Sequence, residues 1–225
     1  TITLVALSLG RASKLLWHPV SQILKTSDWF IEYHKVLRHA GNAEGQELFK
    51  FNKESLFYFH RNLEIAPMGP MKRKLRGDSR VASAVDELGL FPTRHVGDQE
   101  DDEEDEREIA NADEVYTSLD TSLLTVRTAV HDMYKQGINH APDGVNFLIS
   151  SPFSWIDKIC RLLKEAEGSK VSLAVRLPTW EVNPYITQDH PWVVDKYKRS
   201  PRAAERDIGA NPPQIDSTRY DKEAI

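Results

Sequence analysis

Short apolar stretches rich in β-branched residues alternate along this chain with longer stretches in which apolar residues recur at helical spacing. The expected strands cover residues 2–7, 56–59, 63–66, 81–85, 145–149 and 171–177, and the main expected helices cover residues 12–24, 29–37, 113–136 and 153–167. Strands that alternate with helices form a mostly parallel sheet with helices on both faces. The sequence therefore predicts a three-layer α/β fold.

Smaller features refine this outline. Pro19 lies inside the helical stretch 12–24 and predicts a kink or a restart of that helix. Residues 40–46 are expected to form a loop. Two short helices are expected near the C-terminal end, at residues 192–198 and 201–208.

The composition limits the class of protein. The 225 residues are 40% hydrophobic and 28% charged, which is typical of a soluble protein with one sizeable core, or with one domain and a tail. No apolar run approaches the roughly 20 residues that span a bilayer, so no membrane partner is expected. The only cysteine, Cys160, cannot form an internal disulfide, which fits a reducing cytoplasm. The chain begins without methionine inside an expected strand, as part of a longer protein would.

The net charge of −5 conceals a strong segregation of charge along the chain. Residues 71–80 hold five basic side chains against one acid, and residues 98–108 hold nine acids in eleven positions. The basic segment can contact phosphates, including those of a nucleic-acid backbone, or it can be a solvated loop. The acidic run lacks apolar periodicity and the ligand pattern of a calcium loop, so it is expected to be a solvated loop.

The strongest candidate site follows the strand expected at residues 81–85. Two adjacent carboxylates, Asp86 and Glu87, come at its end, and Arg76 lies ten residues before the first of them. In a nucleotide triphosphatase one such acid holds magnesium through its water shell, the next activates the attacking water, and an arginine neutralises phosphate charge. The alternative is a strand that ends in a charged surface turn.

A pair of hydroxyl side chains follows another expected strand. Ser150 and Ser151 come directly after residues 145–149, and ligands of parallel sheets collect at the carboxyl ends of the strands. Hydroxyls in this place can sense a terminal phosphate and its loss. Alternatively, the serines cap the helix that is expected from Phe153.

Motifs for several other chemistries do not occur in these 225 residues. The eight histidines form no HExxH pair, a zinc site is not expected with one cysteine, and no GxSxG sequence indicates a serine hydrolase. The phosphate-cradling GxxxxGK[ST] loop is also absent, so this chain alone is not expected to bind ATP tightly or to hydrolyse it.

Several stretches, taken together and in chain order, resemble the large terminase subunit of tailed bacteriophages, the ATP-driven motor that packages DNA into proheads. LRGDSR followed by SAVDELG, at residues 75–89, resembles that family's arginine-bearing loop and Walker B strand. VNFLISSP resembles its coupling motif, and LPTWEVNP resembles the close of its ATPase core. SPRAAERDIGANPP resembles the linker that precedes its nuclease domain, and KLLWHPVSQILKTSDWF resembles the segment after its Walker A helix.

The resemblance implies a fold of the P-loop NTPase type, of the RecA-like kind, with ATP and Mg²⁺ as ligands. Asp86 would be the magnesium acid, acting through water, and Glu87 the catalytic base. Arg76 would be the arginine finger that reaches into a neighbouring subunit, and Ser150 and Ser151 would be the coupling residues near the nucleotide.

The same resemblance implies the organisation and partners of the protein. Residues 1–188 would be a partial ATPase core, and residues 189–225 a helical linker leading to a nuclease domain. Partners would be double-stranded DNA, further copies in a homo-oligomeric ring, a portal protein and a small terminase subunit, in the cytoplasm of a bacterial host. Two other hypotheses remain: a helicase-like ATPase, and a non-catalytic adaptor or prophage relic that retains the ATPase fold.

Overall fold

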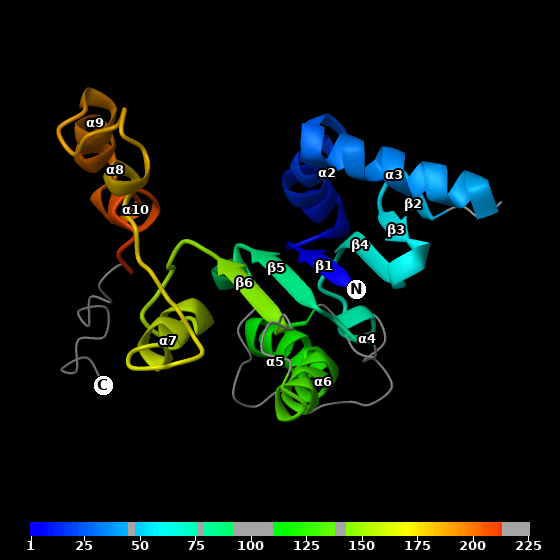
Figure 1. Ribbon diagram of the computed structural model, residues 1–225. Helices are drawn as coiled ribbons and strands as arrows, with labels where there is room; N and C mark the ends of the chain where they lie inside the picture. Colours follow the sequence, from blue (N-terminus) through cyan, green and yellow to red (C-terminus); the bar gives the residue numbers. More distant parts are fainter. Residues whose placement is uncertain (45–47, 76–78, 92–109, 138–142, 213–225) are drawn as a thin grey trace. The chain divides into compact units, whose positions relative to one another are not determined.

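The computed structural model describes all residues except 45–47, 76–78, 92–109, 138–142 and 213–225. The chain divides into two compact units, residues 1–149 and residues 150–225 (Figure 1). Each unit is described by itself below. The domain boundary after residue 188, expected from the resemblance, stays a prediction. The basic Arg76 and the acidic run 98–108 lie outside the described residues.

The first unit is built on a six-stranded sheet of mixed but mainly parallel pairing. Its strands are β1 (Ile2–Val5), β2 (Phe49–Phe51), β3 (Leu56–Tyr58), β4 (Leu63–Met68), β5 (Ala82–Asp86) and β6 (Val145–Ile149). They lie in the order β2-β3-β4-β1-β5-β6. Strand β1 pairs in parallel with β4 and β5, and β5 pairs in parallel with β6, whereas β3 runs antiparallel to both of its neighbours. The predicted α/β class and mostly parallel sheet are confirmed.

The helices of the first unit cover both faces of this sheet. They are α1 (Leu9–Arg11), the π-helical η1 (Ala12–Trp17), α2 (His18–Thr26), α3 (Asp28–Glu44), η2 (Phe59–Arg61), α4 (Lys72–Leu75), η3 (Leu88–Leu90), α5 (Ala112–Ser122) and α6 (Leu124–Lys135). Figure 1 shows α2 and α3 over one face and α5 and α6 over the other. The three-layer arrangement expected from the sequence is therefore present.

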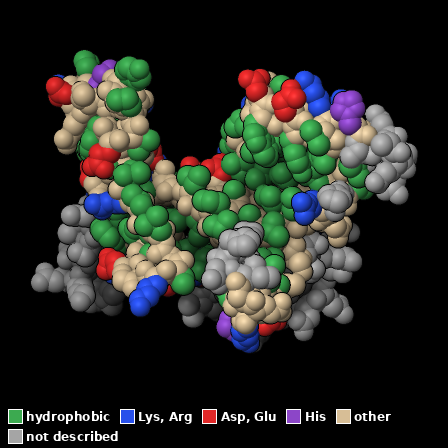
Figure 2. All heavy atoms as spheres, viewed as in Figure 1, with side chains coloured by type: hydrophobic (Ala, Val, Ile, Leu, Met, Phe, Trp, Pro, Cys, Tyr) green, Lys and Arg blue, Asp and Glu red, His purple; other side chains and the backbone are tan. Residues whose placement is uncertain are grey.

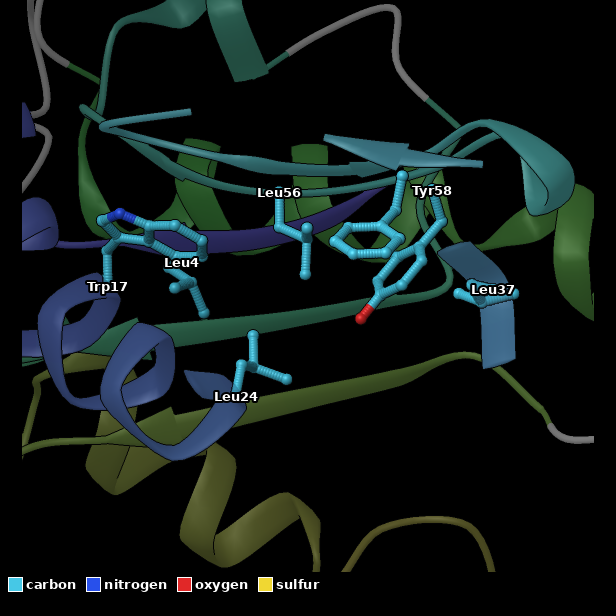
Figure 3. Close-up of a cluster of buried hydrophobic side chains, with 7 residues drawn as sticks. Leu4, Trp17, Leu24, Leu37, Leu56 and Tyr58 are labelled. Carbon is cyan, nitrogen blue, oxygen red and sulfur yellow. The ribbon is translucent and has the colours of Figure 1, made fainter. Parts of the chain in front are cut away.

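The main core lies between the sheet and the helices α2 and α3. Leu4 and Leu56 from the sheet point toward Trp17 and Leu24 from the helical segment, as Figure 3 shows. Residues in register on neighbouring strands point to the same face of a sheet, so Ala84, the register partner of Leu4, also lies on this side. Burial of such side chains, at roughly 2 kcal/mol each, is the main force that holds these layers together.

The helical segment from Leu9 to Thr26 is continuous but changes its geometry ahead of Pro19. In η1 the hydrogen bonds widen, so that the N–H of His18 donates to the carbonyl oxygen of Ser13. Proline has no N–H to donate and crowds the preceding turn. The disturbance that Pro19 predicts therefore takes the form of a π-helical stretch, and the helix does not end.

The structure differs from the sequence-based expectation in several details. No strand forms over residues 171–177, which the structure describes throughout, and residues 40–44 continue α3 instead of forming a loop. The helix expected over 113–136 is two helices that meet at Leu123, and the helix expected from Phe153 begins only at Lys158. Strand β2 was not expected. The three differences in the helices concern where a helix begins, ends or is interrupted. The other two concern a strand that does not form and a strand that was not expected.

The second unit contains short helices around a small core of its own. Its helices are α7 (Lys158–Glu165), α8 (Thr179–Val182), α9 (Pro191–Arg199) and α10 (Pro201–Asp207). Val193, Ala204 and Ile208 are buried together, with Trp180 and Tyr197 packed against them. The two short C-terminal helices expected from the sequence are present as α9 and α10. Within the described parts of the chain, no helix has both the length and the apolar character that crossing a bilayer requires.

Candidate functional site

The two adjacent acids lie where the sequence predicted them, at the carboxyl end of a parallel strand. Asp86 is the last residue of β5 and is in register with Ile149, the last residue of β6. Glu87 follows directly and precedes the single turn η3. Both carboxylates therefore come from the edge of the sheet at which ligands of parallel α/β sheets collect.

Glu87 has an unusual backbone conformation. Its φ of 56° and ψ of 45° lie in the left-handed helical region, which costs a residue with a side chain roughly 1–2 kcal/mol. Its N–H donates to the carbonyl oxygen of Ile149 at 2.8 Å, and its own carbonyl oxygen accepts from Leu90 at 2.9 Å. The surrounding structure thus holds a strained residue in place, and such strain is concentrated at functional sites.

The Glu87 side chain has a second unusual property. Its Oε2 atom is buried and has no hydrogen-bond partner among the described residues. Leaving a buried polar atom without a partner costs about 1–3 kcal/mol, and most such atoms in folded proteins are paired. A buried carboxyl oxygen of this kind is a ready acceptor for a water molecule or for the donor group of a ligand.

The residues on either side of Glu87 anchor the site in the core. Val85 and Leu88 are both buried, and so is Phe91 at the end of the η3 turn. Asp86 and Glu87 are both partly buried as whole residues, whereas the Oε2 atom of Glu87 is itself buried. Both acids therefore keep some access to solvent, although one carboxyl oxygen of Glu87 is shielded from it.

The donor set at this strand end fits a magnesium ion that is held mainly by water and phosphate oxygens. Mg²⁺ typically keeps several waters and takes one or two carboxylates together with substrate phosphates. Among the described residues, no group of three or more histidine, cysteine, aspartate or glutamate side chains could hold a metal ion by itself. Asp86 and Glu87 therefore match a site in which one or two carboxylates hold Mg²⁺ together with water and phosphate oxygens, rather than a site in which protein side chains alone surround the ion.

The basic segment contributes a buried arginine that the sequence did not single out. Arg80 is fully buried (0% exposed). Its Nε donates to Thr3 Oγ1 at 2.9 Å, Nη1 to the carbonyl oxygen of Leu75 at 2.9 Å, and Nη2 to that of Lys74 at 3.3 Å. Arg80 therefore fixes the end of α4 to strand β1. Its role in the described structure is to position the chain beside residues 76–78.

The predicted serine pair begins the second unit. Ser150 and Ser151 follow β6 without a break, and Ser150 Oγ donates to the carbonyl oxygen of Ser151 at 3.0 Å. The alternative that these serines cap a helix at Phe153 is wrong, because α7 begins only at Lys158. The turn before α7 is held instead by Asp157 Oδ2, which accepts from the N–H groups of Phe153 and Ser154.

The structure thus brings two of the predicted site residues, Asp86 and Glu87, to one strand end, and the roles of all the predicted residues stay predictions. Comparison with known proteins adds no assignment: no protein-family model matches this chain, and no curated protein was found to match it. The residue that the sequence reasoning overlooked is Arg80. In the sequence, Arg80 is one of five basic residues in residues 71–80, and this position does not distinguish it from the neighbouring lysines and arginines.

Proposed function

We propose that this chain is the ATPase part of a motor that packages double-stranded DNA into a viral prohead. The observation that carries the proposal is the buried Oε2 of Glu87, without a partner among the described residues, beside Asp86 at the carboxyl end of a parallel strand. The order of the sequence motifs, which resembles that of large terminase subunits, selects DNA packaging among the functions that such a site can serve.

In this proposal the two acids have different roles in ATP hydrolysis. Asp86, which is partly open to solvent, would hold Mg²⁺ through water molecules. Glu87 accepts a hydrogen bond from the attacking water on Oε2 and takes its proton as the water attacks the terminal phosphate. Bound Mg²⁺ would neutralise charge on the phosphates. The left-handed backbone of Glu87 keeps the carboxyl group at the strand end.

The remaining roles rest on the sequence. Arg76 would neutralise charge on the phosphates of a neighbouring subunit's nucleotide. Ser150 and Ser151 would respond to the loss of the terminal phosphate. The last residue of the strand that precedes these serines, Ile149, accepts a hydrogen bond from the N–H of Glu87, so a change at the acid can reach the serines through one hydrogen bond and the adjoining backbone. DNA, further copies in a ring, a portal protein and a small terminase subunit would be the partners.

The test measures ATP binding and hydrolysis by the protein produced from its complete gene. We expect Glu87→Gln to lower turnover by roughly 10²- to 10⁴-fold while MgATP binding is retained, because the amide cannot accept the proton. Glu54→Gln, at an exposed position between β2 and β3, is the matched control and should leave turnover unchanged. Unchanged turnover in Glu87→Gln would refute the base assignment, and a wild-type protein that binds no ATP would favour the non-catalytic adaptor.

A further inference from the structure

The serine turn, residues 150–157 of the second unit, is held by a buried carboxylate. Figure 2 shows lysine, arginine, aspartate and glutamate side chains at the surface of both units, but Asp157 is only 6% exposed. Its Oδ2 accepts from the N–H of Phe153 at 2.7 Å and from the N–H of Ser154 at 2.6 Å. Hydrogen bonds to a charged acceptor are stronger than those between neutral groups. The backbone of the turn is therefore firmly held.

Asp157 stabilises this turn rather than the helix that follows it. It is the N-cap residue of α7, yet its side chain makes no capping hydrogen bond to that helix. An aspartate at an N-cap normally accepts from the second or third N–H of its own helix. Here the carboxylate is used for the turn instead. A departure of this kind from a local rule indicates that the shape of the turn matters.

One side chain of α10 contacts the serine turn. The guanidinium carbon of Arg206 lies 4.4 Å from the centre of the Phe153 ring, a distance at which arginine is attracted to the face of a ring. Asp207 orients the guanidinium group, since Nε and Nη2 of Arg206 donate to its two carboxyl oxygens at 2.6 and 3.0 Å. Hydrogen bonding from Arg206 lowers the pKa of Asp207 below its ordinary value of 3.8, so both groups are charged at neutral pH.

Helix α10 is in turn joined to the other C-terminal helices. Ala204 and Ile208, on either side of Arg206 in the sequence, are buried together with Val193 of α9. The carbonyl oxygen of Ile208 accepts from the N–H of Thr179, the first residue of α8, at 2.8 Å. A displacement of α10 therefore also displaces α8 and α9.

We infer that Arg206 is a positioning residue that transmits a change in the serine turn to helices α8, α9 and α10. Ser150 and Ser151 begin this turn, so their rearrangement shifts the ring of Phe153 and, with it, the guanidinium group of Arg206. The role of the two serines rests on the proposed function, whereas the contact and the transmission through it do not.

The experiment perturbs the serine turn and observes α10 by hydrogen exchange with mass spectrometry. It uses the protein produced from its complete gene, without nucleotide. We expect Asp157→Ala to raise exchange by at least about tenfold in the turn, because two N–H groups lose a charged acceptor. Exchange in α10 should rise by about threefold, which corresponds to the loss of one cation–π contact. Circular dichroism checks the fold, and Asp157→Asn replaces Asp157→Ala if the alanine variant is unfolded.

The same perturbation is repeated in variants that alter the contact. In an Arg206→Ala or a Phe153→Leu background, Asp157→Ala should raise exchange in the turn alone. Phe153→Tyr keeps the face of the ring and should retain the response of α10. Arg199→Ala, which removes an exposed arginine at the end of α9, is the matched control and should also retain it.

Two exchange results overturn the inference. One is unchanged exchange in α10 when Asp157→Ala has loosened the serine turn. The other is an equal response of α10 with and without Arg206, which would mean that the change travels by another route.

A measurement of function separates this inference from the proposed function. In a protein that hydrolyses ATP and translocates DNA, Arg206→Ala should leave ATP turnover unchanged and lower the DNA translocated per ATP by about tenfold, a coupling of ordinary size. An equal loss of turnover and translocation would overturn the positioning role. A wild-type protein that binds no ATP would refute the proposed function, and the exchange experiment without nucleotide would still decide the transmission.

Discussion

Glu87 is tied to Ile149 by a hydrogen bond of 2.8 Å from its N–H to the Ile149 carbonyl oxygen, at the point where its backbone turns left-handed. This bond comes at the end of the β5–β6 ladder and holds the residue although its conformation is unfavourable. The side chain adds a second cost, since Oε2 is buried without a partner among the described residues. Two local costs at one residue indicate a position kept for function rather than for stability.

We therefore expect Glu87→Gly to stabilise the first unit by about 1 kcal/mol. Glycine relieves the left-handed strain and removes the unpaired oxygen, which together outweigh its greater flexibility in the unfolded chain. The free energy of unfolding in urea is the measurement. Asn62→Gly is the control, because Asn62 has a φ of 47° but is a residue type that tolerates this region. A loss of stability of more than 1 kcal/mol in Glu87→Gly would contradict the view that the site is strained.

Arg80 gives a prediction of the opposite sign. Its planar guanidinium group donates to three oxygens that lie in different directions, and a lysine ammonium cannot reproduce this fork. We expect Arg80→Lys to lower the free energy of unfolding by about 2–4 kcal/mol, since several buried acceptors lose their donors. Urea unfolding followed by circular dichroism measures this. Arg61→Lys, at the exposed last residue of η2, should change stability by less than about 0.5 kcal/mol.

The alternation of strands and helices, and the position of Asp86 and Glu87 at a strand end, could be predicted from the sequence because both depend on local patterns. The left-handed backbone of Glu87 was not, because glutamate gives no indication of a conformation that glycine or asparagine would suggest. The burial of Arg80 was not readable either, since it depends on acceptors from β1 and α4 that only the folded chain brings together.

Residues 171–177 illustrate a different limit of the sequence. Their alternation of apolar and polar side chains is correct for a strand, yet a strand exists only where a neighbour supplies backbone hydrogen bonds. The reverse holds for β2, whose three residues are too few for a pattern but pair with β3 in the folded chain. Whether a segment forms a strand therefore depends on a neighbouring strand in the folded chain as well as on its own alternation of apolar and polar residues.

His34, on the side of α3 that packs against strands β2 and β3, predicts that stability depends on pH. His34 is buried, its ring stacks on Phe49 at 4.5 Å, and its Nε2 lies 2.9 Å from the Tyr58 hydroxyl. Burial, and then the positive charge of Arg38, lower the pKa of His34 from its ordinary value of 6.5. Burial raises the pKa of Tyr58 to about 12, so its hydroxyl stays protonated across the neutral range.

Because the pKa of His34 is lower in the folded state, the unfolded chain binds the proton more readily. The stability from the neutral imidazole is fully present above pH 6.5 and is lost as the pH falls below that value. We expect the urea midpoint to decrease between about pH 7.5 and pH 5, and His34→Phe to reduce this decrease. His18→Phe, at an exposed position, should retain it. An equal pH dependence in all three proteins would exclude His34 as the titrating group.

The second unit gives a steric prediction, at the end of α10. A Cβ atom at Gly209 would lie 2.7 Å from Tyr197 Oη and 2.8 Å from the carbonyl oxygen of Glu205. Tyr197 cannot easily move away, since its hydroxyl donates to Glu205 Oε2 at 2.9 Å and its ring packs in the small core. We expect Gly209→Ala to destabilise this unit by about 1–3 kcal/mol.

Thermal unfolding, followed by tryptophan fluorescence, measures the effect of Gly209→Ala, because Trp180 belongs to the core that the substitution disturbs. Gly10→Ala is the matched control. Its Cβ would meet only Ser8 Oγ, at 4.0 Å, and alanine favours the helix by up to about 1 kcal/mol, so its stability should be unchanged or higher. Equal unfolding temperatures for Gly209→Ala and the wild-type protein would mean that the contact between Tyr197 and the end of α10 yields without cost, and that this core is loosely packed.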